Sequence, residues 1–221
     1  MDEAAHIATP TPESNAFMLA ALIGGIPQVS TEAIAVRAGE GEDARIRHAL
    51  RRWEREQFGY LFVTTGSDTA NRTEENFTIE RLQAAPYHLK RTEDVHILLN
   101  AGDTAAQMRW LALMARQLRI DSITLSAPPY HLPRVYLTAI KCFAKEGLRP
   151  DDCFLIPDPT PMSPAQLVPS QKMRAMHLMH VEFDRIRRYI EKGVIADMND
   201  LMVTIEQLIS IMAERHLIVQ E

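Results

Sequence analysis

Four side chains able to bind an anion or move a proton follow one another closely between residues 126 and 134. They are Ser126, Tyr130, His131 and Arg134. Arg134 can place two N–H groups on a phosphate or a carboxylate. His131 has an ordinary pKa of about 6.5, which suits either anion binding or acid/base chemistry near neutral pH. A lone histidine beside an apolar segment is more often structural, so the prediction of a site depends on other residues.

Those other residues follow further segments that read as strands. The four groups are Gly24 and Gly25; Gly66 and Ser67; Asn100, Asp103 and Thr104; and the group from Ser126 to Arg134. In a parallel sheet the carboxyl ends of the strands meet at one edge, where ligands of open α/β sheets bind. The helices that follow offer free backbone amides, which favour an anion. Together the four groups predict a site for a small molecule with a phosphate or carboxylate.

Each group also has a plain structural interpretation. A glycine pair is more often a tight turn than a binding loop. Asp103 or Thr104 can cap a helix, because either side-chain oxygen can accept a hydrogen bond from the first free amides. These alternatives stay open for the residues taken singly, and only the expected convergence of the four groups favours a site.

The elements that must position these residues are predicted from residue type and periodicity. Strands are expected at 17–23, 60–64, 94–99, 120–125 and 154–156. Helices are expected at 43–57, 73–83, 103–118 and 135–147, where apolar residues recur at three- and four-residue steps. Alternating strands and helices indicate a mostly parallel sheet covered on both faces. The predicted fold is a Rossmann-like three-layer α/β fold with a C-terminal helical extension.

Three regions are expected along the chain of 221 residues. Residues 1–15 read as a flexible leader and residues 16–160 as the α/β core. Four prolines between 157 and 164 predict a lapse of regular structure. Residues 161–221 then hold two helices packed on the core. The first runs from about 163 or 170 to 192 and ends at Gly193, and the second from 197 or 200 to 216.

Composition excludes several classes of protein. Hydrophobic residues make up 46% and charged residues 24%, as in ordinary globular proteins, and the net charge of -5 disfavours a general nucleic-acid or anionic-membrane surface. Two isolated cysteines, Cys142 and Cys153, favour a reducing compartment. The acidic N-terminus is unlike a signal peptide. The sequence contains no uninterrupted apolar run of about 18 residues, so no membrane span is predicted. A cytoplasmic protein is expected.

Two further patterns in the C-terminal region carry weaker predictions. His177 and His180 lie three apart near Glu182 and Asp184, but this spacing is common by chance, so no metal site is predicted. A methionine-rich run from 173 to 179 is expected to pack against the core. A homodimer or partner surface on these helices is the alternative.

Five short segments form a recognisable pattern along the chain: Gly24-Gly25, Arg45 with Ala49, Thr65-Gly66-Ser67, Asn100 with Thr104 and Gln107, and Tyr130-His131-Leu132-Pro133-Arg134. In this pattern the chain resembles the bacterial YdcF-like proteins, the group that includes the SanA and ElyC envelope proteins. Weaker similarity surrounds Glu182, Arg185 and Tyr189. The resemblance implies a Rossmann-like fold with a pocket at the strand ends and largely unassigned chemistry. It also implies a role in envelope biogenesis for some members. For members without a membrane anchor it implies binding of a nucleotide or of S-adenosylmethionine.

Three functional hypotheses follow. The first is a protein that binds a small anionic ligand, either as a binding protein or as a hydrolase or transferase. In it Arg134 and Arg45 neutralise charge and His131 is the acid/base. The second is an S-adenosylmethionine-binding protein or methyltransferase. Against it, no convincing acidic residue follows a second strand, where it would hold the ribose hydroxyls, because Glu93 and Asp94 precede their strand. The third is a non-catalytic sensor or interaction protein.

Overall fold

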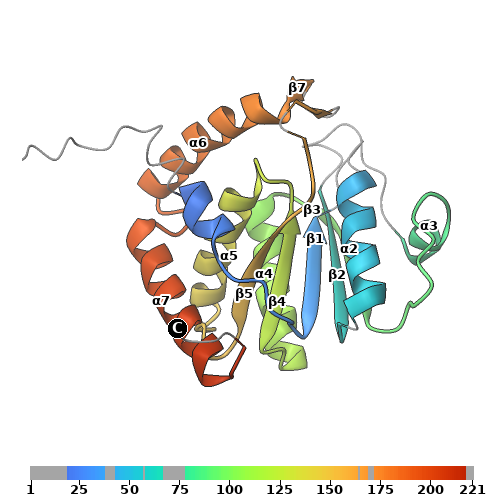
Figure 1. Cartoon of the computed structure of the whole chain (residues 1–221), viewed down its shortest axis with the longest axis horizontal. Coiled ribbons are helices and arrows are strands. Elements are labelled where there is room, and N and C mark those ends of the chain that lie inside the picture. The colour runs from blue at the N-terminus through green and yellow to red at the C-terminus, as the bar shows by residue number, and fades with distance from the viewer. Residues whose placement is uncertain are drawn as a thin grey trace, which may run out of the picture.

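The computed structural model describes residues 19–37, 43–56, 58–66, 78–163, 165–168 and 172–217. Five strands form one all-parallel sheet in the order β3-β2-β1-β4-β5 (Figure 1). They are β1 (Ala33–Arg37), β2 (Tyr60–Gly66), β3 (Val95–Ala101), β4 (Ser122–Ala127) and β5 (Phe154–Pro159). Helices cover the sheet, so the predicted Rossmann-like α/β fold is confirmed.

The helices form the outer layers of the fold. They are α2 (Asp43–Glu56), α3 (Ile79–Gln83), α4 (Thr104–Leu118), α5 (Leu132–Lys145), α6 (Ala175–Glu191) and α7 (Met198–Glu214). The apolar faces of α4, α5 and α7 belong to one hydrophobic cluster, and that of α2 to another. Figure 1 shows α6 lying across the end of the sheet at which the strands finish. Among the described residues, none of the helices combines the length and apolar character that crossing a membrane requires.

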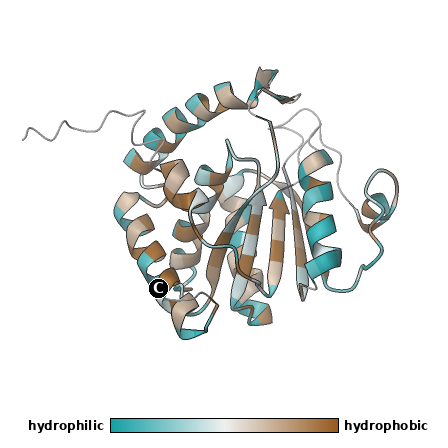
Figure 2. Ribbon diagram, in the orientation of Figure 1, coloured by the Kyte–Doolittle hydropathy of each residue, from teal (hydrophilic) through white to brown (hydrophobic). Residues whose placement is uncertain are grey.

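The central strand β1 shows why the sheet is buried on both faces. Ala33 and Ala35 pack in the cluster with α4 and α5, whereas Ile34 and Val36 pack in the cluster with α2. Side chains alternate between the two faces of a strand, so a strand covered on both sides must be apolar at every position. Figure 2 shows this, with hydrophobic colours along the strands and hydrophilic colours over much of α2.

The prediction of a strand at 17–23 is wrong. Its described part is helical and continues to residue 24 (blue in Figure 1). Leu19, Ile23 and Ile26 are buried, whereas Ala21 and Gly24 are exposed. Burial at every third or fourth residue belongs to a helix with one covered face and does not fit a central strand.

The first strand is β1 instead, which the sequence prediction missed. Its five residues include two alanines, which have low strand propensity, and one arginine. Gly24 and Gly25 therefore end a helix and do not end a strand. The backbone N–H of Gly25 donates to the carbonyl of Ala21 at 2.8 Å, and Gly25 lines a groove with Ile205 and Ile209 of α7.

The other predicted strands are confirmed within a few residues. The helix predicted at 135–147 begins earlier, at Leu132, which places His131 at its N-cap and Arg134 in its first turn. Of the helix predicted at 73–83, the described part is α3, and residues 73–77 lie outside the described residues.

The C-terminal region contains the two predicted helices and one element that was not predicted. A short antiparallel hairpin, β6 (Leu167–Val168) with β7 (Met173–Arg174), precedes α6 and delays its start to Ala175. The second helix, α7, begins at a capping box formed by Asp197 and Asp200. Ile186, Leu201 and Leu208 belong to the same hydrophobic cluster as β4 and α5, so these helices continue the core of the sheet.

The two glycines offer a matched test of the corrected helix. A Cβ at Gly24 meets nothing within 4 Å, whereas a Cβ at Gly25 lies 3.1 Å from the carbonyl oxygen of Ala21. We expect Gly24→Ala to raise the free energy of unfolding by about 0.5 kcal/mol, as alanine does in helices. Gly25→Ala should be less stable than Gly24→Ala in urea unfolding. The reverse order would contradict the helical assignment.

Candidate functional site

The candidate site lies where the connections of the sheet change direction. The chain builds β1, β2 and β3 towards one edge and then places β4 on the other side of β1. In doubly wound sheets, ligands bind at this switch point, outside the carboxyl ends of the two strands. Arg37 ends β1, and Ser126 is the neighbour of Val36 in the register between β1 and β4. The turn after β4 then brings His131 to the same place.

A cluster of charged side chains surrounds His131. Arg37 Nη1 lies 3.0 Å from His131 Nε2, and Glu182 Oε2 lies 3.4 Å from His131 Nδ1. Arg134 Nε donates to Glu182 Oε2 at 2.5 Å, and Arg185 Nη1 donates to Glu182 Oε1 at 2.6 Å. We call these five residues the His131 cluster. Its members come from β1, α6 and the start of α5, so only the fold brings them together.

Both ring nitrogens of His131 face arginine groups. Arg37 Nη1 lies 3.0 Å from Nε2, and Arg134 Nη2 lies 3.1 Å from Nδ1, which is also 3.4 Å from Glu182 Oε2. An arginine can only donate, so these contacts favour the neutral ring, which has an accepting nitrogen, over the imidazolium, which has none. Burial lowers the pKa of His131 to about 3, and the positive charges of Arg134 and Arg37 act in the same direction. The ring is neutral at physiological pH and both nitrogens are engaged. The expectation that His131 is the acid/base is therefore not supported by its surroundings.

Arg134 is also committed within the protein. Besides its bonds to Glu182, its Nη1 donates to Thr104 Oγ1 at 3.1 Å. Burial alone would raise the pKa of Glu182, but the hydrogen bond of His131 and the hydrogen bonds and positive charge of Arg134 lower it far below the ordinary value. Glu182 is thus an ionised carboxylate, and it binds the guanidinium of Arg134, which the sequence analysis expected to bind a ligand.

The start of α4 resolves the alternatives for Asp103 and Thr104. Asp103 is the N-cap, and its Oδ1 accepts from the backbone N–H of Ala106 at 2.7 Å. Thr104 is the first residue of the helix and its hydroxyl accepts from Arg134. Asp103 therefore caps α4, whereas Thr104 connects α4 to the His131 cluster.

Arg45 and Tyr130 border the cluster. Arg45 Nη1 donates to the carbonyl of Arg37 at 3.2 Å, and burial lowers the pKa of Arg45 to about 10, so it stays charged at neutral pH. The ring centroid of Tyr130 lies 6.3 Å from that of His131. Tyr130 also packs with Ala175 and Leu178 of α6. Two arginines, Arg37 and Arg45, thus approach one another beside His131.

A small cavity lies next to Arg37, between the strand ends and α4. Its volume is about 10 Å³, which suits one water molecule or one ligand atom, and Thr64, Gln107 and Val135 are among its lining residues. Thr64 Oγ1 and Gln107 Oε1 are buried and have no hydrogen-bond partner among the described residues. The Gln107 amide nitrogen donates to the carbonyl of Thr65 at 3.3 Å, which orients its oxygen away from that carbonyl.

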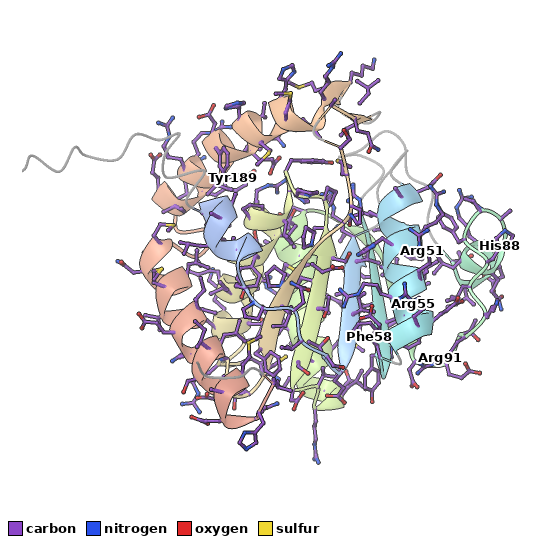
Figure 3. All side chains as sticks on the ribbon, viewed as in Figure 1. Arg51, Arg55, Phe58, His88, Arg91 and Tyr189 are labelled. Atoms are coloured by element: carbon purple, nitrogen blue, oxygen red, sulfur yellow. The ribbon has the colours of Figure 1, made fainter. Side chains whose placement is uncertain are left out.

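A second polar cluster, missed in the sequence, lies between α2 and β5. Asp158 Oδ2 lies 3.0 Å from His48 Nε2, and Asp158 Oδ1 lies 2.9 Å from Arg52 Nη1. The available signal was periodicity, because Arg45, His48 and Arg52 are three and four residues apart and share one face of α2. Arg51 and Arg55, by contrast, are on the exposed side of α2 (Figure 3).

The remaining predicted residues are placed as follows. Gly66 and Ala101 are in register at the ends of β2 and β3, and Asn100 lies in β3. Ser67 lies outside the described residues. Gly24 and Gly25 do not join the strand ends. His177 and His180 are exposed, and no three metal-binding side chains converge anywhere in the described chain.

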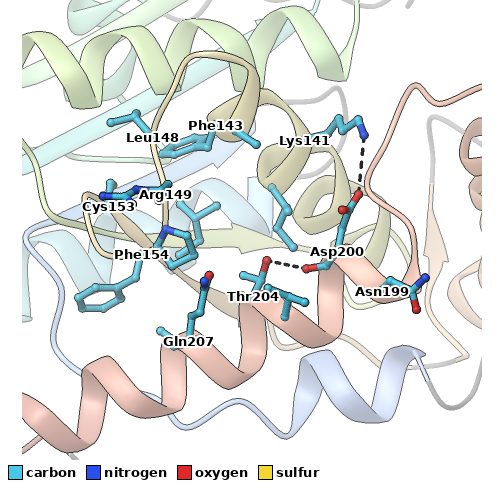
Figure 4. Close-up of a pocket in the computed structure, with 16 residues that line it drawn as sticks. Lys141, Phe143, Leu148, Arg149, Cys153, Phe154, Asn199, Asp200, Thr204 and Gln207 are labelled. Carbon is cyan, nitrogen blue, oxygen red and sulfur yellow. Dashed lines mark hydrogen bonds and ion pairs between the residues drawn. The ribbon is translucent and has the colours of Figure 1, made fainter.

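A larger groove lies elsewhere, between α5, α7 and the start of β5 (Figure 4). Its volume is about 310 Å³, and Phe143, Leu148 and Phe154 are among its mostly apolar lining residues. Lys141 pairs with Asp200 at 3.7 Å along its side. None of the predicted site residues lines this groove, and it is at the opposite end of β5 from Asp158. We therefore place the candidate site at the switch point.

Removing the charge of Glu182 tests how the His131 cluster holds α6. In Glu182→Gln, Arg134 and Arg185 lose a buried anionic partner, and such losses cost about 3–5 kcal/mol. We expect a decrease of this size in the free energy of unfolding, measured with urea. Glu191→Gln, on an exposed part of the same helix, is the control and should change it by less than about 0.5 kcal/mol. Equal effects would contradict the role of Glu182.

The lowered pKa of His131 predicts a pH dependence of stability. Below about pH 6.5 the unfolded chain protonates this histidine, whereas the folded protein resists until about pH 3. The stability is therefore complete above about pH 6.5 and decreases through this window, by about 2 kcal/mol at pH 5. His131→Asn should remove this part of the decrease, whereas His177→Asn, at an exposed position, should not. Urea unfolding at about pH 6.5 and at pH 5 measures the loss of stability in the unmodified protein and in both variants. An equal loss in all three proteins would contradict the prediction.

Comparisons with known proteins give no further guide to the chemistry. Neither the protein-family models nor the curated proteins nor the solved structures contain a match to this chain. The function is therefore argued from the geometry of the switch point.

Proposed function

We propose that this protein binds a small molecule through a phosphate or carboxylate group at the switch point between β1 and β4. The observation that carries the proposal is the approach of Arg37 and Arg45 beside His131, at the carboxyl end of β1. We assign the acid group of the ligand to Arg37 and Arg45 because both guanidinium groups lie near the carboxyl end of β1, at the switch point. Guanidinium groups are well suited to such oxygens because they donate two parallel hydrogen bonds.

The arrangement of charge supports this assignment. The described residues of the site hold four guanidinium groups: those of Arg134 and Arg185 donate to Glu182, that of Arg37 contacts His131, and that of Arg45 donates to the carbonyl of Arg37. The buried oxygens of Thr64 and Gln107 beside Arg37 add polar groups that a bound molecule can use.

The resemblance to the YdcF-like proteins supports the same proposal. Four of the residues that carry it, Arg45, Thr104, His131 and Arg134, lie in or beside one cluster together with Glu182. A hydrolase or transferase activity would require a proton acceptor other than His131, because that ring is neutral and fully engaged.

A thermal-shift screen tests the proposed function. The panel contains inorganic phosphate, nucleotides, sugar phosphates and S-adenosylmethionine. A ligand at 100 times its Kd should stabilise the folded protein by about 2.7 kcal/mol. We expect Arg45→Gln to lose the shift and Arg109→Gln to keep it, since Arg109 is an exposed residue of α4.

The outcomes separate the hypotheses. A shift retained in Arg45→Gln would show that the ligand binds elsewhere. If no compound shifts the melting temperature, binding of an acid group is contradicted, and the exposed apolar residues of α7, such as Met202, Val203 and Ile209, would favour an interaction protein.

A further inference from the structure

His48 and Asp158 form a second imidazole–carboxylate pair close to the switch point. His48 Nε2 and Asp158 Oδ2 are 3.0 Å apart, and the side chains are 17% and 9% exposed. Arg52 holds the other carboxylate oxygen at 2.9 Å. The pair is therefore fixed from two sides but still reachable by solvent, which distinguishes it from the 4% exposed ring of His131.

The geometry leaves one nitrogen of His48 available. Burial alone would raise the pKa of Asp158, but the hydrogen bond of His48 and the charge of Arg52 lower it, so Asp158 is an ionised acceptor. His48 Nε2 must then carry the proton, and we infer that Nδ1 of the neutral ring has a lone pair. Among the described residues, no hydrogen bond to His48 Nδ1 accompanies the bond from Nε2 to Asp158. A histidine oriented by a carboxylate in this way is suited to accept a proton.

The pair also lies beside the proposed anion site. Asp158 and Ser126 are partners in the register between β5 and β4, and Ser126 in turn neighbours Val36 of β1. His48 follows Arg45 by three residues on one face of α2, where side chains lie about 5–6 Å apart at Cβ. A molecule whose acid group contacts Arg45 therefore extends within reach of His48.

We propose that His48 is the proton acceptor of this site, and that the ligand brings an O–H group, its own or that of an attacking water, to its Nδ1. The O–H bond breaks, the electron pair remains on oxygen, and the proton moves to Nδ1, where the carboxylate of Asp158 stabilises the imidazolium. This inference rests on the proposed function, because the acid group at Arg37 and Arg45 positions the O–H. It gives the site a proton acceptor other than the neutral, engaged ring of His131.

Diethylpyrocarbonate tests the inference on the full chain. The lone pair of an accessible imidazole attacks a carbonyl carbon of the reagent, and the leaving ethyl carbonate yields ethanol and carbon dioxide. Peptide mass spectrometry at neutral pH measures the rate for each histidine. We expect His48 and the exposed His177 to react and His131 to remain unmodified. Inorganic phosphate at ten times its Kd should slow His48 about tenfold and leave His177 unchanged, because it occupies about nine-tenths of the sites.

Two variants address the role of Asp158. In Asp158→Asn the side-chain amide can donate to Nε2, which favours the proton on Nδ1, so modification of His48 should slow. Asp184→Asn, at an exposed position of α6, is the control and should leave the rate unchanged. The phosphate experiment uses the unmodified sequence, so it decides the inference even where Asp158→Asn does not fold.

The outcomes distinguish this inference from the proposed function. If phosphate raises the melting temperature and protects His48, both are supported. If it raises the melting temperature without protecting His48, the proton-acceptor role is overturned and anion binding stands. If His48 stays unreactive while His177 reacts, its Nδ1 is not available and the inference is overturned. If phosphate neither shifts the melting temperature nor protects His48, the assignment of an acid group fails and the inference fails with it.

Discussion

The buried carboxylate of Glu182 is the interaction on which the rest of the site depends. Removing a carboxylate from water costs several kcal/mol unless partners of opposite charge surround it. Here the guanidinium groups of Arg134 and Arg185 supply those partners. The bonds of Arg134 to Glu182 join α6 to the start of α5, and Tyr130 adds an apolar contact to α6 nearby. Helix α6 is therefore part of the site.

Glu182 also engages Arg134, the residue whose position in the sequence made it the expected anion ligand. Arg134 in turn contacts Nδ1 of His131 at 3.1 Å. In the proposed function Arg45 keeps the role expected of it, Arg37 takes that of Arg134, and His48 takes that of His131. The two imidazoles that lie beside carboxylates differ in their contacts. Both nitrogens of His131 face arginine groups, whereas the bond of His48 to Asp158 involves Nε2.

The sheet explains why these residues meet at one place. Strands buried on both faces have few positions for polar side chains except at their ends, and parallel strands bring those ends to one edge. Arg37, Ser126 and Asp158 follow the apolar parts of β1, β4 and β5. The order β3-β2-β1-β4-β5 puts the switch point between β1 and β4. The helices that follow these two strands supply Arg45 and Arg134, whereas Glu182 comes from α6.

The sequence by itself determined the elements with strong local patterns and the residues adjacent to them. The strands β2 to β5, the helices α2, α4 and α7, and the placing of Thr104, His131 and Arg134 at the ends of elements all follow from local periodicity and capping. The short, alanine-containing β1 lacks such a pattern, so the apolar helix before it was taken for the first strand. Only the tertiary structure decided the pairings. Glu182 is 48 residues from Arg134 and Asp158 is 110 residues from His48, and periodicity carries no information about which distant charges the fold will bury together.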